Sequence, residues 1–178
     1  IDNVSVIRTV DQTAGNDFAT TYAENGSPVS IADIDNSVRD TDDANMESAS
    51  VTLTNPETGD RLLVNGSSAA SGTLASGITW TRTDSVVTLS GSFTKAQYAA
   101  AIQLIQFENT TETPSATPRI INTIVNDGNV NSNTAVTTIN VDRAPDPVND
   151  AFSANEGSTV SGNVLTNDTD TGDGPAAT

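Results

Sequence analysis

The side chains in this sequence that could do chemistry are carboxylates, and they are clustered. The chain has 23 acidic residues against seven basic ones, for a net charge of −16. Residues 11–43 hold eight of the acids and residues 142–173 hold seven. Clustered carboxylates repel one another unless a cation lies among them. Oxygen ligands of this kind suit a hard cation, and Ca²⁺ ahead of Mg²⁺, because Ca²⁺ accepts irregular coordination cages.

Several functional classes are excluded by what the sequence lacks. Histidine and cysteine are absent, which removes the commonest general base, thiolate metal ligands and disulfides. No Gly-x-Ser-x-Gly turn or phosphate-binding loop is present in the sequence. A glycosidase needs only two carboxylates, but here the acids fall at predicted hinges without an aromatic-lined cleft. We therefore expect that the protein is not an enzyme.

Charge and apolar pattern also limit the partners. A strongly acidic chain is not expected to bind nucleic acid, because phosphate contacts need Lys and Arg. No apolar run approaches the length of a membrane-spanning helix, so membrane insertion is not expected. We find no signal peptide and expect the chain to come from the middle of a longer protein.

The acidic groups need a framework, and the sequence predicts an all-β one. Hydrophobic residues make up only 35% of the chain, and the abundant Thr, Ser, Asn and Gly favour strands and turns. Apolar and polar residues alternate in short runs such as Ser50–Thr54, Arg119–Val125 and Asn133–Val141. Strands at this spacing favour a β-sandwich. Residues 39–47 and 66–77 are predicted to be loops.

One short helix is predicted near residues 94–103. Thr94 and Gln97 have the spacing of a capping box, in which each side chain bonds the backbone of the other residue. Tyr98 and Ile102 then fall at helical spacing. The remaining elements are expected to be strands and turns.

A pattern recurs near the two ends of the chain and predicts repeats. Glu24-Asn-Gly-Ser-Pro-Val-Ser30 corresponds to Glu156-Gly-Ser-Thr-Val-Ser161, and Asp40-Thr-Asp42 corresponds to Asp168-Thr-Asp170. The predicted units are the last strand of a preceding repeat with its linker (1–11), one complete repeat (12–141), a linker (142–150) and the opening of the next repeat (151–178).

The order and spacing of several motifs carry a family resemblance. The motifs are Tyr22-Ala-Glu-Asn-Gly26, Asp40-Thr-Asp-Asp43, Ala49-Ser-Val-Thr-Leu53, the segment 98–109, Val125-Asn-Asp-Gly128 and the segment 139–150. Together they resemble the bacterial cadherin-like repeats of large secreted RTX-type adhesins and extracellular surface fibres, over essentially the whole chain. The resemblance implies a Greek-key β-sandwich of the cadherin or immunoglobulin type. It also implies an extracellular location, secreted or at the cell surface, and Ca²⁺ between consecutive repeats.

The resemblance implies a cluster of calcium ligands at each end of the complete repeat. At its base Glu24 would join residues of the linker and of the next unit, namely Asp142, Asp146, Asn149, Asp150, Asp168 and Asp170. At the opposite end the ligands would be Asp40 and Asp42, Asp127 from the last hairpin, and Asp11 and Asp17 from the preceding linker. The family's mid-domain Asp-Arg-Glu motif has no counterpart here, so one or two ions per junction are expected rather than three.

The function that these features imply is structural or adhesive, in cell adhesion, biofilm or surface-layer architecture. The partners would be neighbouring repeats or other copies of the protein. One alternative is a fibre subunit whose end strands complete a neighbouring copy by strand addition. Another is a carbohydrate-binding module that holds a polysaccharide on an exposed Trp80 or Tyr98, although a lone Trp in an aromatic-poor sandwich is more often core. The acidic loops could also be solvated turns. Asp33 and Asp35 form a further Asp-x-Asp pair, to which we assign a structural role because they fall within or beside a predicted strand.

Overall fold

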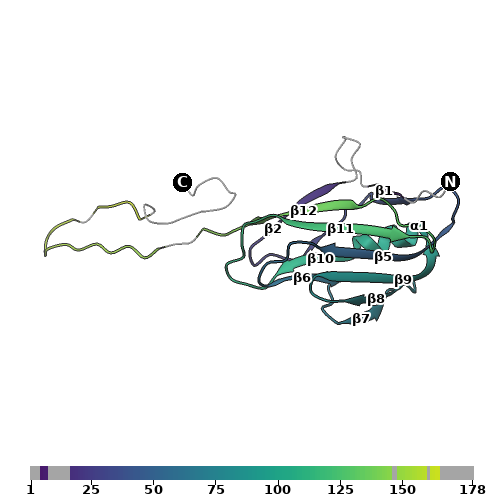
Figure 1. The fold of residues 1–178 in the computed structure, drawn as a ribbon. Helices are drawn as coiled ribbons and strands as arrows, with labels where there is room; N and C mark the ends of the chain where they lie inside the picture. Colours follow the sequence, from purple (N-terminus) through teal and green to yellow (C-terminus); the bar gives the residue numbers. More distant parts are fainter. Residues whose placement is uncertain (1–4, 8–16, 146–147, 160, 165–178) are drawn as a thin grey trace.

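The computed structural model describes residues 5–7, 17–145, 148–159 and 161–164. Its elements in chain order are β1 (Ser5–Ile7), β2 (Phe18–Ala23), β3 (Val29–Ser30), β4 (Ser37–Arg39), β5 (Asn45–Leu53), β6 (Asp60–Val64), β7 (Ser71–Thr73), β8 (Thr79–Arg82), β9 (Val86–Thr94), α1 (Lys95–Gln103), β10 (Ile105–Asn109), β11 (Arg119–Asn126) and β12 (Ala135–Asp142). Figure 1 shows the strands stacked in layers, with the described part of the C-terminal segment running away from them.

The layers form a Greek-key β-sandwich. The larger sheet has seven strands in the order β2-β12-β11-β5-β9-β8-β7, and the smaller has three in the order β3-β10-β6. A two-stranded ribbon joins β1 to β4. The chain crosses repeatedly between the sheets, from β5 to β6, back to β7, across again to β10 and back to β11, and such crossings are typical of Greek-key sandwiches. The expected all-β sandwich with one short helix is confirmed.

The period-two pattern of the sequence decides which residues enter the core. Along β11 every second residue is buried, so Ile121, Thr123 and Val125 face inward. Between the two sheets Tyr22 and Phe107 meet edge to face, with ring centroids 5.5 Å apart. Trp80 is 6% exposed and Tyr98 is fully buried, which confirms that both aromatic side chains belong to the core.

The short helix begins as the sequence predicts. Thr94 is its N-cap, and the hydroxyl of Thr94 accepts a hydrogen bond from the Gln97 amide while the Gln97 side chain accepts one from the Thr94 amide. The capping box therefore forms, and it fixes where β9 ends and α1 begins. Tyr98 and Ile102 point from α1 into the core. Among the described residues, no helix is long and apolar enough to cross a membrane.

Two predicted loops contain strand. The predicted loop 66–77 includes β7, which has only Ser, Gly and Thr and so no apolar alternation to reveal it. It pairs with β8, where the absence of a side chain on Gly72 leaves room for the Trp80 ring. The predicted loop 39–47 is too long, because β5 begins at Asn45 and pairs with β9 across a bulge.

The strand expected near the N-terminus lies at Ser5–Ile7. It pairs antiparallel with β4 of the same chain, from Ser5 opposite Arg39 to Ile7 opposite Ser37. This pairing adds β1 to the sandwich that follows it. The assignment of residues 1–11 to a preceding repeat, like the other predicted domain boundaries, stays a prediction.

A buried polar network joins the two sheets at the end where β12 finishes. The Arg119 guanidinium donates to both carboxylate oxygens of Asp60, with Nε to Oδ2 at 2.6 Å and Nη2 to Oδ1 at 3.3 Å. Both side chains are fully buried. Asn109 donates to Asp60 Oδ1 at 2.8 Å, and the Tyr22 hydroxyl donates to the Asn109 carbonyl at 2.8 Å. Four strands, β2, β6, β10 and β11, are thereby linked.

We predict that Asp60→Ala destabilises the domain severely. The substitution leaves the Arg119 charge buried without its carboxylate, which costs about 3–5 kcal/mol of the free energy of unfolding. The matched control is Glu108→Gln, which breaks the part-exposed Arg61–Glu108 ion pair and is expected to cost about 0–1 kcal/mol. Urea denaturation followed by circular dichroism measures both, and equal losses in the two variants would contradict a central role for the buried pair.

Candidate functional site

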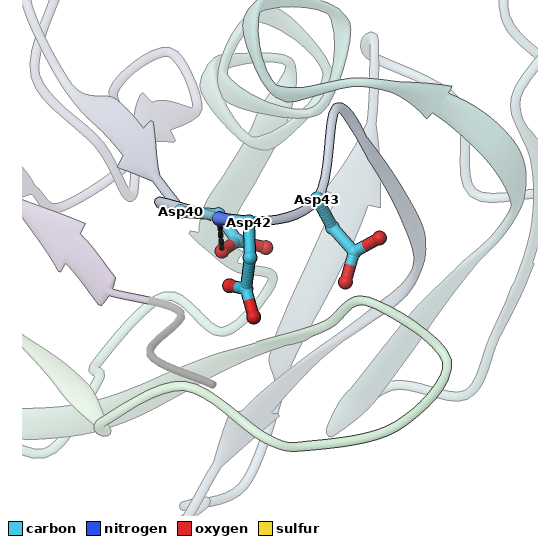
Figure 2. Close-up of side chains that lie close together, drawn as sticks. All are labelled: Asp40, Asp42 and Asp43. Carbon is cyan, nitrogen blue, oxygen red and sulfur yellow. Dashed lines mark hydrogen bonds between the residues drawn. The ribbon is translucent and has the colours of Figure 1, made fainter. Parts of the chain in front are cut away.

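The loop between β4 and β5 brings three carboxylates together. Asp40, Asp42 and Asp43 each offer an oxygen atom, and these atoms all lie within 4.8 Å of one another. Figure 2 shows the Asp40 and Asp42 side chains adjacent and Asp43 further along the loop; the Asp42 amide donates to Asp40 Oδ1 at 3.2 Å. Asp40 and Asp42 are predicted site residues that the fold does place together. Asp43 was not predicted as a ligand, although it belongs to the same acidic run.

Lys95 fixes this loop from the helix side. Its ammonium group donates to the carbonyl of Asp40 at 2.9 Å and to the carbonyl of Asp43 at 2.7 Å. The side chain comes from the first residue of α1, directly after the Thr94 cap. The sequence did not single out Lys95, although it is the only lysine of the chain. Because Lys95 engages backbone carbonyls, it orders the loop without occupying the carboxylates.

Asp40 and Asp42 interact closely enough to titrate as a pair. Partial burial works to raise the pKa of Asp40, but hydrogen bonds from the Asp42 backbone and side chain, the Asp43 backbone and the charge of Lys95 hold that pKa below its ordinary value. The hydrogen bond to Asp40 raises the pKa of Asp42, with the Asp40 charge acting the same way. With both groups ionised, Asp40 Oδ2 is shielded from solvent and has no hydrogen-bond donor among the described residues. A proton on Asp42 could form a hydrogen bond to this oxygen, or a cation could bind it.

Asp127 and Asp17 lie at the same end of the sandwich as this loop. Asp127 follows the end of β11 and is 6% exposed, and its Oδ1 accepts from the amides of Asn129 and Val130 at 2.7 and 2.8 Å. Asp17 precedes β2, and its Oδ1 accepts from the Val136 amide at 3.3 Å. Neither belongs to the carboxylate cluster, which within the described part of the chain consists of the three loop residues.

Glu24 occupies the opposite end, where the linker leaves the sandwich. Its amide donates to the Asp142 carbonyl at 2.8 Å, and its Oε2 accepts from the Ala144 amide at 3.0 Å. Asp142, at the end of β12, is exposed. Two of the residues predicted for the base of the repeat, Glu24 and Asp142, therefore meet through the backbone of the linker.

Of the other predicted ligands, Asn149 and Asp150 lie within the described part of the chain, and neither is gathered at an end of the sandwich. Asn149 and Asp150 are exposed and belong to the segment that runs away from the sandwich (Figure 1). Asp11, Asp146, Asp168 and Asp170 lie outside the described residues. Their role as calcium ligands stays a prediction.

We predict that the Asp40–Asp42 pair loses its protons in two separate steps. Because the pKa of Asp42 is raised and that of Asp40 is lowered, Asp42 should release its proton at the higher pH. Carboxyl ¹³C chemical shifts followed through a pH titration measure both groups. In Asp40→Ala the Asp42 pKa should fall towards its ordinary value, because both the hydrogen bond to Asp40 and the neighbouring charge are gone. Coincident titration of the two carboxyls in the unaltered protein would contradict the pairing.

We predict that Glu24 protects the Ala144 amide from solvent exchange. Glu24→Ala removes the acceptor, so hydrogen exchange at Ala144 should accelerate, whereas Glu24→Gln keeps a side-chain oxygen that can accept the bond and should retain most of the protection. Exchange measured by NMR distinguishes the two variants, with the core residue Ile139 as internal reference. Unchanged exchange in Glu24→Ala would show that the side chain does not hold the linker.

Comparison with known proteins finds no relative of this chain. No protein-family model matches the chain, and neither a curated protein nor a solved structure matches it.

Proposed function

We propose that this domain is a structural repeat of an extracellular adhesin or surface fibre, stiffened by Ca²⁺ at its junctions with neighbouring repeats. The observation that carries the proposal is the convergence of the Asp40, Asp42 and Asp43 carboxylates at one end of the sandwich. The shielded Asp40 Oδ2, which lacks a donor among the described residues, supports it. Carboxylate oxygens in an irregular loop are the ligands that Ca²⁺ accepts.

The mechanism follows from charge. Three ionised carboxylates at this distance repel one another, and a net charge of −16 makes the approach of a similar neighbouring domain unfavourable. A divalent cation held by this loop would cancel that repulsion and could accept further oxygen ligands from the adjoining unit. The ion would thereby stiffen the junction, and its binding energy would add to the stability of the folded state.

Burial of the aromatic residues favours this proposal over a carbohydrate-binding module. Stacking on a sugar needs an exposed ring, yet Trp80 is 6% exposed and Tyr98 is fully buried. Burial, with the Glu47 charge adding, raises the pKa of Tyr98 to about 12, and its hydroxyl donates to the Gly91 carbonyl at 2.8 Å. Both rings are therefore part of the core and do not offer an exposed face to a sugar.

A fibre subunit joined by strand donation is the second candidate. One observation favours it: the segment after the sandwich exposes apolar side chains, with Val148 49%, Phe152 50% and Val164 55% exposed. A segment that exposes such residues is suited to pairing with a sheet edge of another copy. In that case the protein would associate with itself, and Ca²⁺ would not be needed for stability.

We predict that millimolar Ca²⁺ raises the melting temperature of the protein and that equal Mg²⁺ does so much less. At a free Ca²⁺ concentration of 100 times Kd, binding stabilises the folded state by about 2.7 kcal/mol. The double variant Asp40→Asn/Asp42→Asn should lose the response. Thermal unfolding followed by circular dichroism, together with calorimetric titration, measures the effect.

The control removes the same charge from elsewhere. Glu57→Gln/Glu112→Gln changes two exposed acids in loops outside the cluster and should keep the full Ca²⁺ response. If the unaltered protein shows no shift with Ca²⁺, the acidic loop is a solvated turn, and self-association in sedimentation would then favour the strand-donation fibre. If both double variants lose the response equally, general charge rather than the loop is responsible.

A further inference from the structure

The first and last strands of the seven-stranded sheet, in chain order, lie side by side and run in the same direction. β2 pairs parallel with β12 over six residue pairs, from Phe18 opposite Thr137 to Ala23 opposite Asp142. The other strand pairs within this sheet are antiparallel among the described residues. Because the partners are parallel, the chain enters β2 at one end of the pair and leaves β12 at the opposite end.

Further hydrogen bonds extend the pairing beyond both ends of the paired residues. Beyond the last strand pair, the Glu24 amide donates to the Asp142 carbonyl and the Glu24 carboxylate accepts from the Ala144 amide. Before the first pair, the Asp17 carboxylate accepts from the Val136 amide. Hydrogen bonds therefore connect the two strands from the residue before β2 to the first residues of the linker.

We propose that the β2–β12 pair is the mechanical clamp that carries tension across this domain. Tension between the residues before β2 and those after β12 pulls the two strands past each other along their own axes. In that direction the ladder hydrogen bonds lie across the load and share it, so several must break together. If the strands were pulled apart from one end, the bonds would break one after another.

Tyr22 prevents the strand from sliding. Its side chain is 1% exposed and its ring packs edge to face on Phe107 of the smaller sheet. Its hydroxyl donates to the Asn109 carbonyl, next to the buried Asp60–Arg119 pair. Displacing β2 along β12 would pull this side chain out of the core, so the apolar packing adds to the resistance of the hydrogen bonds.

The inference deepens the proposed function and rests on the domain's carrying tension between its neighbours. Its geometry involves no cation, because the clamp uses backbone ladder bonds, Tyr22 and the Glu24–linker contacts. Failure of the calcium proposal and failure of the clamp can therefore be separated by measuring force with and without Ca²⁺.

The test is single-molecule force spectroscopy in two pulling directions. The chain has no cysteine, so pairs of introduced cysteines define the attachment points. Asp17→Cys with Pro145→Cys loads β2 and β12 from opposite ends, whereas Asp17→Cys with Thr134→Cys loads them from the same end; Asp17, Thr134 and Pro145 are all exposed. In EDTA and in Ca²⁺ alike, the first geometry should give a several-fold higher rupture force. Equal forces in the two geometries would overturn the clamp, whatever Ca²⁺ does to the melting temperature.

A pair of proline variants locates the load on the ladder. The Glu24 amide bonds β12, and because backbone groups of a strand point alternately to its two sides, the amide of Thr20 also faces β12 while that of Thr21 faces away. Thr20→Pro should lower the rupture force in the opposite-end geometry much more than Thr21→Pro. The same-end geometry and the melting temperature of each variant control for general destabilisation. Equal losses of force at matched stability would contradict the assignment of the load to β2–β12.

Discussion

The rest of the structure depends on the buried ion pair of Arg119 and Asp60, which joins the two sheets at one end of the sandwich. Removing two charges from water is costly unless nearly every donor and acceptor finds a partner. Here the guanidinium also donates to the carbonyls of Ser115 and Thr117, and Asp60 accepts from Asn109 and from the Glu57 amide. The pair therefore fixes the loops on either side of it, and with them the spacing of the two sheets.

At the opposite end of the sandwich, three carboxylates lie close together in the loop between β4 and β5. There Lys95 donates to the carbonyl oxygens of Asp40 and Asp43 and leaves the three carboxylates close together. The two ends thus treat carboxylates differently. Asp60 is neutralised within the fold and serves stability, whereas the loop carboxylates retain a repulsion that a proton or a divalent cation can relieve.

The proposed roles fall on separate parts of the domain. The cation would act between units, at a loop that exposes oxygen ligands beyond the ends of the strands. The β2–β12 pair would act within the unit, along the path by which tension crosses it. Tyr22 connects this path to the buried ion pair, because its hydroxyl bonds the Asn109 carbonyl and the Asn109 side chain bonds Asp60. Stability and resistance to load would then depend on one network.

The sequence by itself determined the local structure: the alternation along β11, the capping box of Thr94 and Gln97, and the turns at Asn25 and Gly128, both with positive φ. These features depend on neighbouring residues, so a short window contains their cause. Only the tertiary structure decided the parallel β2–β12 pairing, the strand at β7 and the contact of Lys95 with the acidic loop. Each depends on residues distant in the chain, and no local pattern records a partner that the fold as a whole brings near.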